Sequence, residues 1–178
     1  MNKDRENIMP IRIYAYVDMD GVLCNFSKPI SLATGIPADL IDRRMMNEEQ
    51  TALFIEYMKG RDHSFWANLE PLKGWDELIK FVETLDSNWH IATSPNENPA
   101  CYSGKVMWIN RHLGDKMHGR LFIGKHKERL AKEHSILIDD SVKKCVDFRN
   151  AGGKAVLYTG WNKLSQRALQ VEMENLYE

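Results

Sequence analysis

Two carboxylates, Asp18 and Asp20, stand directly after an apolar run in the stretch IRIYAYVDMDGVLCNF at residues 11–26. The β-branched and aromatic residues of this run favour a buried strand. Carboxylates at the end of such a strand are costly to desolvate unless a cation, a ligand or hydrogen bonds compensate them. Gly21 follows them, and it permits the positive φ or the close backbone approach that a turn around a ligand needs. We therefore expect an active site at this strand end.

Two later apolar runs also end in polar residues that could do chemistry. Thr93 and Ser94 follow one of these runs, and Asp139 and Asp140 follow the other. Each pair taken alone is explained by a turn or a helix cap. In open α/β sheets, however, ligands bind outside the carboxyl ends of the strands, and parallel strands bring those ends to one edge. The sequence therefore predicts that the three groups form one site.

The predicted site is rich in oxygen ligands and strongly negative, which suits Mg²⁺ together with a substrate phosphate. Thr93 or Ser94 can donate a hydroxyl to such a phosphate, and Lys125 or Lys127 can supply a positive charge. An aspartate can attack phosphorus as a nucleophile and form an acyl phosphate. A second carboxyl group two residues on can protonate the leaving oxygen and then activate water.

Other kinds of site do not fit the chain. The DMDG segment suggests a calcium loop, but Val22 and Pro29 occupy two of the later ligand positions. The segment at residues 104–106 lacks the upstream glycine and the Ser/Thr of a phosphate-binding P-loop. The cysteines are odd in number and contain no CxxC pair, which disfavours a zinc site and a disulfide framework.

The elements that must position these residues alternate along most of the chain. Residues 27–66 contain no convincing strand and form a helical insertion, with helices at 27–34 and 38–46 and a third that begins at a capping-box-like NEEQ. The helices that we predict after the insertion lie at residues 75–85, 103–113, 127–133, 142–150 and 163–176. The strands that we predict lie at residues 11–17, 89–92, 120–123, 135–138 and 155–158. This order implies an α/β fold with a parallel sheet flanked by helices.

Composition limits the function further. The 178 residues fit one domain with a small inserted subdomain, and the net charge of −1 gives no general attraction to nucleic acid or to anionic membranes. Residues 1–10 form a polar N-terminal tail without the apolar core of a signal peptide. No run approaches the ~20 apolar residues that span a bilayer. We expect a cytoplasmic protein that acts on a small molecule.

The motifs resemble those of the haloacid dehalogenase (HAD) superfamily of phosphohydrolases. VDMDGV at residues 17–22 resembles the first motif, IATS at 91–94 the second, a lysine near Lys127 the third, and IDD at 138–140 the fourth. The segments DMDGVLCNF, FWANLEPLKGW, ATSPNENPACYSGKVMWINRHLG and LIDD resemble the 5'(3')-deoxyribonucleotidase family more closely. The likeness covers most of residues 11–158.

This resemblance implies a Rossmann-like HAD core at residues 11–26 and 67–178, with a small helical cap at residues 27–66. It implies Mg²⁺-dependent removal of phosphate from nucleoside monophosphates, with 5'-deoxyribonucleotides preferred. Asp18 would be the nucleophile and Asp20 the general acid and base. The resemblance places Mg²⁺ on the Asp18 carboxylate, on the Asp20 backbone carbonyl and on Asp140, with Asp139 adjacent.

The resemblance also assigns substrate-binding roles. Thr93 and Ser94 would bind the phosphate, and Lys127 would neutralise it. Lys125 competes with Lys127, because the spacing to the fourth motif is about two residues longer here than in that family. The fourth motif also continues with SVKK instead of the family's usual Arg-Pro.

The family's aromatic base pocket corresponds to Phe26, Phe65 and Trp66, which could equally pack between cap and core. The same chemistry on another small phosphomonoester, such as a sugar phosphate, is an alternative, as is a nucleotide-binding module without catalysis. The expected partner is a small nucleotide, with no nucleic acid polymer and no membrane. The oligomeric state stays open, with a homodimer among the options.

Overall fold

A five-stranded parallel sheet forms the centre of the molecule. The computed structural model describes residues 11–177, without the side chains of Lys116 and His118, and the tail predicted at residues 1–10 lies outside it. The strands are β1 (Tyr14–Val17), β2 (His90–Thr93), β3 (Leu121–Ile123), β4 (Ser135–Asp139) and β5 (Lys154–Leu157). Their order in the sheet is β3-β2-β1-β4-β5, and each neighbouring pair is parallel. The parallel sheet that the alternating pattern predicts is confirmed.

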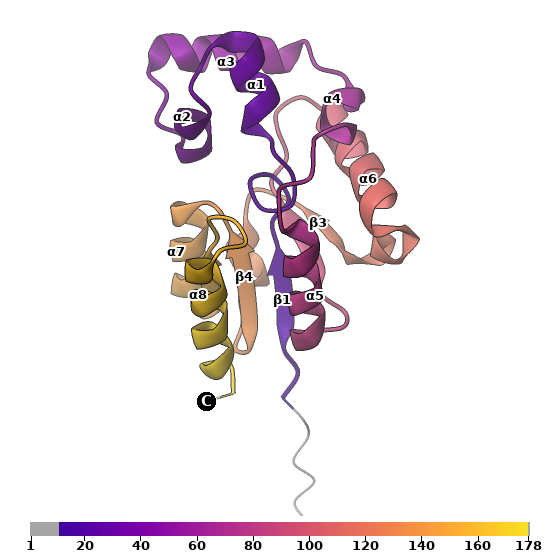
Figure 1. The fold of residues 1–178 in the computed structure, drawn as a ribbon, viewed down its shortest axis with the longest axis vertical. Coiled ribbons are helices and arrows are strands. Elements are labelled where there is room, and N and C mark those ends of the chain that lie inside the picture. The colour runs from indigo at the N-terminus through magenta and orange to yellow at the C-terminus, as the bar shows by residue number, and fades with distance from the viewer. Residues whose placement is uncertain (1–10, 178) are drawn as a thin grey trace, which may run out of the picture.

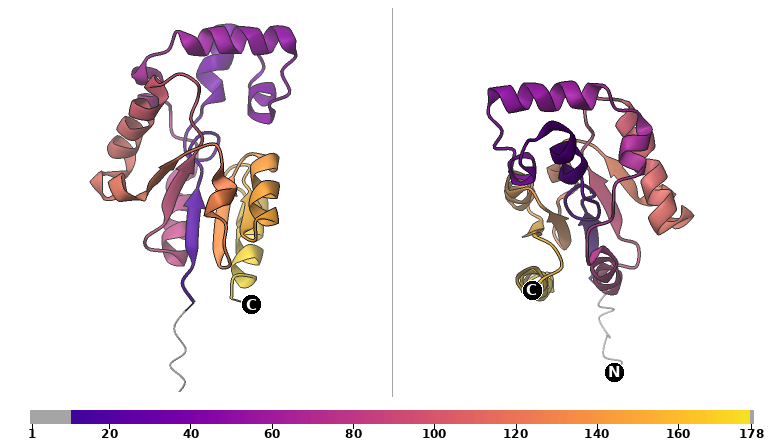
Figure 2. Two further views of the ribbon diagram at one scale, coloured as in Figure 1. Left: turned by 180° about the vertical axis from the view of Figure 1, so that it is seen from behind. Right: turned by 45° about the horizontal axis from the view of Figure 1, so that its top comes forward.

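Helices cover both faces of the sheet, and the alternation of side chains along β1 separates the two cores. Ala15 and Val17 point into the larger core, which includes apolar residues of α5 (Trp75–Leu85) and α8 (Lys163–Glu174). Tyr16 points to the opposite face, where it packs with Phe148 of α7 (Val142–Asn150). Figures 1 and 2 show α5 and α8 on one side of the sheet and α7 on the other. Burial on both faces explains why the strands are almost continuously apolar.

Four helices follow β1 and precede α5 in the chain. They are α1 (Ser27–Thr34), α2 (Ala38–Arg43), α3 (Glu48–Lys59) and α4 (His63–Ala67). In Figure 1, α3 lies across the top of the molecule, beyond the carboxyl ends of the strands, and α2 hangs from it towards α7. The other end of this group reaches α6 (Ala100–Leu113), on which α4 packs. Residues 27–66 are thus helical, as the sequence predicts.

The close packing of α4 on α6 depends on Gly104. A Cβ atom at this position would lie 2.4 Å from the backbone oxygen of His63 and 2.8 Å from the Cβ of Trp66. Only a residue without a side chain allows the two helices to approach this closely. The contact fixes α6, which carries a side chain of the site described below.

Some predicted boundaries are wrong. The helix predicted at 38–46 ends at Arg43, because Arg44 takes a left-handed conformation with φ of 57° and its N–H turns back to the carbonyl of Ile41. The helix predicted at 127–133 is a 3₁₀ helix, η2 (Lys127–Leu130). The chain leaves it because the Ser135 hydroxyl accepts the N–H of Lys132 and donates to its carbonyl, which closes a turn instead. Helix α6 starts three residues earlier than predicted.

A further 3₁₀ helix, η1 (Asp115–Arg120), connects α6 to β3. Among residues 11–177, no helix combines the length and the apolar character that crossing a membrane requires.

Candidate active site

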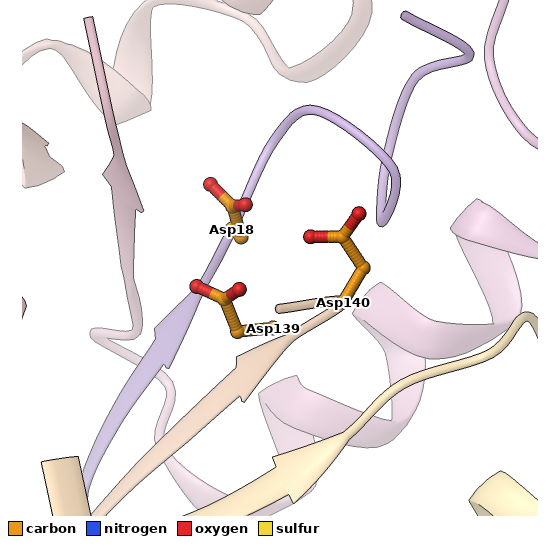
Figure 3. Close-up of side chains that lie close together, drawn as sticks. All are labelled: Asp18, Asp139 and Asp140. Carbon is orange, nitrogen blue, oxygen red and sulfur yellow. The ribbon is translucent and has the colours of Figure 1, made fainter. Parts of the chain in front are cut away.

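Three carboxylates meet at the carboxyl end of the sheet. β1 pairs with β4 so that Val17 lies beside Ile138, and this register places Asp18 next to Asp139. Asp18, Asp139 and Asp140 each offer one oxygen, and these oxygens all lie within 4.8 Å of one another. Figure 3 shows the three side chains grouped above the ends of the two strands. The convergence that the strand-end pattern predicts is therefore present for these residues.

Lys127 supplies the cation that faces this cluster. Its ammonium group lies 2.7 Å from Asp18 Oδ1 and 2.6 Å from Asp139 Oδ2, and all three side chains are buried. Burial acts to lower the pKa of Lys127, but the carboxylates of Asp18 and Asp139 outweigh it and raise that pKa. Lys125 lines the same cavity but is exposed. Lys127 and not Lys125 is thus the lysine that contacts the clustered carboxylates.

Asp140 approaches the chain so closely that residue 21 must lack a side chain. A Cβ atom on Gly21 would lie 2.1 Å from Asp140 Oδ2, and Gly21 has φ of +79°. Both properties that the sequence suggests for this glycine, the positive φ and the close approach, are therefore used. They bring the DMDG turn against the end of β4.

One lysine does not neutralise three carboxylates. Burial and the nearby charges of Asp18 and Asp139 raise the pKa of Asp140 to about 8. Burial and the charge of Asp18 likewise raise the pKa of Asp139. Carboxylates that resist ionisation at this spacing form a site where an added cation would be stabilised. The hard oxygen donors and their mutual distance fit a divalent cation such as Mg²⁺.

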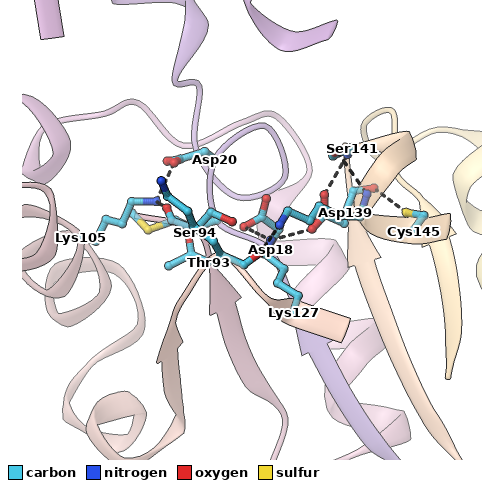
Figure 4. Close-up of polar contacts among 12 residues, drawn as sticks. Asp18, Asp20, Thr93, Ser94, Lys105, Lys127, Asp139, Ser141 and Cys145 are labelled. Atoms are coloured by element: carbon cyan, nitrogen blue, oxygen red, sulfur yellow. Dashed lines mark hydrogen bonds and ion pairs between the residues drawn. The ribbon is translucent and has the colours of Figure 1, made fainter. Parts of the chain in front are cut away.

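A second buried lysine, Lys105, holds the other side of the site. It lies on α6 and is fully buried, and its ammonium group lies 2.6 Å from Asp20 Oδ2 and 2.6 Å from Thr93 Oγ1. It also donates to the backbone oxygen of Ser94 at 3.0 Å. Figure 4 shows Lys105 and Asp20 to one side of Asp18, with Lys127 on the other side. Asp20 is thus fixed at the site, and Lys105 is a site residue that our sequence analysis missed.

The sequence carries a signal for Lys105 that helical spacing would have revealed. Cys101, Trp108 and Ile109 lie four residues before and three and four residues after it, and all are buried. A lysine on the apolar face of an amphipathic helix cannot reach water, so it must find a buried partner. Our interpretation considered Lys105 only as part of a P-loop, and the strand-end pattern does not include helix residues.

The hydroxyls of the second motif differ in their partners. Thr93 Oγ1 accepts from Lys105, whereas Ser94 Oγ is buried and has no hydrogen-bond partner among the described residues. Ser94 also lines the cavity above the carboxylates. A buried hydroxyl without a partner is costly, so Ser94 is suited to donate to a group that enters the cavity.

A cavity of about 920 Å³ lies between the strand ends and the helices above them. The carboxylates form its floor, and Phe54 and Met58 of α3 are among its walls, together with Phe26 and Trp66. Volumes of roughly this size accommodate small-molecule ligands, and apolar walls with a few polar groups are typical of such sites.

The three aromatic residues predicted as a base pocket lie together, but not all of them reach this cavity. The ring centroid of Phe65 lies 6.0 Å from that of Phe26 and 5.1 Å from that of Trp66. Phe26 and Trp66 line the large cavity, whereas Phe65 lines a smaller one of about 290 Å³ that is bounded by α1 and α4. Phe54, which our sequence analysis left out of the pocket, packs edge-on against Phe26 at 6.4 Å.

Sequence comparison identifies a relative in a bacteriophage. The chain is 28% identical over 131 residues to a protein of Vibrio phage KVP40 that carries the provisional name 5'(3')-deoxyribonucleotidase. The match covers 72% of this chain and 66% of the phage protein, so it spans just under two thirds of the relative's length. No protein-family model matches the chain.

Solved structures with the same fold are HAD-like hydrolases. A haloacid dehalogenase-like hydrolase from Streptococcus pneumoniae aligns over 94% of this chain and 92% of its own, with a TM-score of 0.58 and 16% identity. A HAD-superfamily hydrolase from Geobacter sulfurreducens aligns over 85% and 89%, with a TM-score of 0.53 and 13% identity. A HAD family enzyme from Bacteroides thetaiotaomicron, crystallised as a variant with magnesium and inorganic phosphate, aligns over 87% and 98% at a TM-score of 0.50 and 11% identity.

These similarities confirm the resemblance that the motifs indicate. The chain has the fold of HAD-like hydrolases, and its sequence is similar to that of a protein named as a deoxyribonucleotidase.

Proposed function

We propose that this protein is a Mg²⁺-dependent phosphatase of nucleoside monophosphates, with 5'-deoxyribonucleotides as its preferred substrates. The observation that carries the proposal is the meeting of Asp18, Asp139 and Asp140 within 4.8 Å, beside the ammonium group of Lys127 and beneath a cavity large enough for a nucleotide. A site that only bound nucleotides would not need a carboxylate nucleophile and a second carboxyl group two residues away.

Asp18 begins the reaction in this mechanism. One of its carboxylate oxygens attacks the phosphorus atom, the bond from phosphorus to the nucleoside oxygen breaks, and an acyl phosphate forms on Asp18. Asp20 donates a proton to the departing nucleoside oxygen. Lys127 and the Ser94 hydroxyl face the phosphoryl oxygens and stabilise the charge that they carry.

The second half of the reaction frees the enzyme. A water molecule attacks the phosphorus of the acyl phosphate, Asp20 takes a proton from that water, and the bond from phosphorus to the Asp18 oxygen breaks. Inorganic phosphate leaves, and Asp18 is again a carboxylate. Lys105 orients Asp20 in the resting site through their 2.6 Å ion pair.

Mg²⁺ is the cofactor in this proposal, held by the carboxylates of Asp18 and Asp140 and by the backbone carbonyl of Asp20, with Asp139 adjacent. Two features support it: the oxygen-only donor set with its raised Asp140 pKa, and the magnesium and phosphate in the Bacteroides thetaiotaomicron structure of the same fold. When bound, the ion offsets negative charge on the phosphate and on the carboxylates.

The preference for nucleotides depends on residues 27–66, which we propose form a cap over the HAD core. Phe26 and Phe54, which are both partly exposed, give the cavity apolar ring surfaces against which a nucleobase can pack, whereas Trp66 lines the cavity but is fully buried. The similarity to the phage protein points to the same substrate class.

Release of inorganic phosphate from a substrate panel tests the proposal. The panel contains deoxyribonucleoside and ribonucleoside 5'-monophosphates, 3'-monophosphates and sugar phosphates, each assayed with magnesium and with a chelator. We expect turnover of nucleotides only with the metal, and higher kcat/KM for deoxyribonucleotides. Sugar phosphates turned over as well as nucleotides would refute the substrate class, and turnover unaffected by the chelator would refute the metal.

Two variants test the mechanism. Asp18→Asn keeps the shape of the side chain but removes the nucleophile, and we expect kcat to fall by at least about a thousandfold. The control is Asp147→Asn, on the surface of α7, where the carboxylate pairs with Lys143. We expect this control to retain full activity, and undiminished turnover by the Asp18 variant would exclude the proposed nucleophile.

A further inference from the structure

The loop between β2 and α6 reaches up to the end of α3 through one side chain. The side-chain amide of Asn98 points its nitrogen at three backbone oxygens: those of Met58 at 2.9 Å, Lys59 at 3.4 Å and Arg61 at 2.6 Å. Met58 and Lys59 belong to the last turn of α3, where carbonyls run short of helical N–H partners, and Arg61 lies two residues beyond the helix. The Met58 oxygen also accepts the N–H of Arg61 at 3.2 Å. Asn98 therefore closes the end of a helix that lies 37 or more residues earlier in the chain.

The other atoms of Asn98 tie the same residue to the core. Its Oδ1 accepts the N–H of Ala100, the first residue of α6, and its own N–H donates to Asn96 Oδ1, both at 3.0 Å. The donor and acceptor ends of the amide are thus both used, with the nitrogen towards α3 and the oxygen towards α6. The Asn98 amide thus hydrogen-bonds the end of helix α3 to the start of helix α6.

The two segments that Asn98 joins both line the large cavity. α3 contributes Phe54 and Met58 to the lining, and the loop contributes residues 95–99. The phosphate side of the site does not depend on this contact, because Thr93 ends β2 and Lys105 is buried on α6. Asn98 therefore lies between α3, which would contact the leaving group, and the end of β2 with α6, which would hold the phosphate.

We propose that Asn98 is a positioning residue that latches helix α3 to the loop after β2 and so fits the cavity to a large leaving group. This inference extends the proposed function and depends on it for the identity of the substrate. The latch acts on the part of the substrate that lies beyond the phosphorus atom. A substrate with a nucleoside leaving group needs the latched wall, whereas a small phosphate ester needs only the strand ends.

Asn98→Asp removes the hydrogen bonds to the end of α3 but keeps the one that caps α6. Aspartate keeps the oxygen that accepts the Ala100 N–H, but it cannot donate to the three carbonyls and it places a negative charge against them. We expect kcat/KM for a deoxyribonucleoside 5'-monophosphate to fall roughly tenfold, mainly through KM, on the scale of one or two lost hydrogen bonds. For p-nitrophenyl phosphate, which has a small leaving group, we expect kcat/KM to stay within about twofold.

Asn68→Ala is the matched control. It removes another side-chain hydrogen bond that joins helices, the one from Arg111 of α6 to Asn68 Oδ1 at 2.9 Å, at a position outside the large cavity. We expect kcat/KM of this variant for both substrates to equal that of the wild type. An equal fall for the two substrates in Asn98→Asp, or no fall for the nucleotide, would overturn the latch.

Hydrogen exchange tests the latch without any assay of activity. The amides at the carboxyl end of α3, at residues 56–61, should exchange faster in Asn98→Asp than in the wild type, while those of β1 and β4 stay unchanged. Unchanged exchange at residues 56–61 would refute the latch even if nucleotides proved to be the wrong substrate class. Failure of the wild type to hydrolyse nucleotides would instead count against the proposed function alone.

Discussion

The strand edge and the helices above it hold their side chains in different ways. At the strand edge, Asp18 and Asp139 are buried, and Lys127 lies within 2.7 Å of both. In helices α1–α3 and the turns between them, large apolar side chains remain exposed, with Leu32 at 79% and Met45 at 65%. The floor of the cavity is therefore fixed by short ionic contacts between buried side chains. Its roof, formed by helices α1–α3, is held by apolar packing, by the exposed ion pair of Lys28 with Glu70 and by the Asn98 amide.

This difference suits the two tasks that we assign to the regions. Charges that stabilise a reacting phosphoryl group are effective only if they are held in place before the reaction, and rigid strand ends do this well. Recognition of a leaving group tolerates more movement, because apolar contact depends weakly on angle. We expect substitutions at the edge to have large effects and substitutions in the roof to have smaller ones that depend on the substrate.

The largest contrast should come from a pair of lysines. Lys105 is buried with three polar partners at the edge, whereas Lys59 is an exposed lysine at the end of α3. Replacing Lys105 with Met keeps the apolar stem but leaves the Asp20 carboxylate and the Thr93 hydroxyl without their partner. We expect this to cost about 3 kcal/mol of unfolding free energy, measured by urea denaturation.

Lys59→Met is the matched change in the roof, and we expect it to alter the unfolding free energy by less than about 0.5 kcal/mol. If both lysine variants lost similar stability, the edge and the roof would not differ in the way that the ion pairs indicate.

The next contrast uses two glycines that share a backbone conformation. Gly21 at the edge and Gly35 in the roof have φ of +79° and +74°, but a Cβ on Gly21 would meet Asp140 whereas one on Gly35 would meet nothing within 4 Å. Gly35→Ala should cost only the left-handed backbone strain, about 1 kcal/mol. Gly21→Ala should cost roughly 2–3 kcal/mol, because the Asp140 carboxylate must also move.

Magnesium separates the two glycine variants further. In thermal denaturation, we expect the added ion to raise the Tm of the wild type and of Gly35→Ala, and to raise that of Gly21→Ala much less. An equal rise in all three proteins would mean that Asp140 is not part of a metal site.

The strand edge was largely predictable from sequence, and the roof was not. Asp18, Asp139 and Asp140 follow apolar runs, and the geometry of a parallel sheet alone predicts that they meet. Lys105 and Asn98 lie on a helix and in a loop, and their partners are 85 and 37–40 residues away in the chain. Helical spacing can show that Lys105 is buried, but no local pattern identifies partners that are so distant in the chain. The aromatic cluster was predicted as a group, but which ring faces the cavity depends on packing that periodicity does not specify.

The pH dependence of stability tests whether the carboxylates at the strand edge are crowded around Asp140. The pKa of Asp140, about 8 in the fold, lies above the ordinary aspartate value of 3.8, so between these values the folded protein binds a proton that the unfolded chain does not. Without divalent cations, stability should therefore fall as the pH rises from 6 to 9, by about 1 kcal/mol or more. Urea denaturation at several pH values measures this fall.

Magnesium should offset that loss, because the ion stabilises the carboxylate form, and its effect should be greater at pH 9 than at pH 6. Asp140→Asn removes the group and should flatten the profile. A wild-type profile without slope in the absence of cations would show that the carboxylates are not crowded as described.

The smallest effects should separate two phenylalanines in the aromatic cluster. Phe26 and Phe65 pack edge-on with ring centroids 6.0 Å apart, but only Phe26 lines the large cavity. Leucine at either position preserves apolar character and removes similar packing, so both variants should lose about 1 kcal/mol of stability. Phe26→Leu should in addition raise KM for a deoxyribonucleotide about threefold to fivefold, whereas Phe65→Leu should leave KM unchanged.

Steady-state kinetics of the two variants, with p-nitrophenyl phosphate as a second substrate, decides which ring contacts the substrate. The rise in KM for Phe26→Leu should be confined to the nucleotide, because the small ester does not reach the roof. A rise for Phe65→Leu instead would mean that the base occupies the smaller cavity bounded by α1 and α4. The leaving group would then contact α1 and α4 in place of α3. The contact of Asn98 with α3 would not shape the part of the site that binds the leaving group.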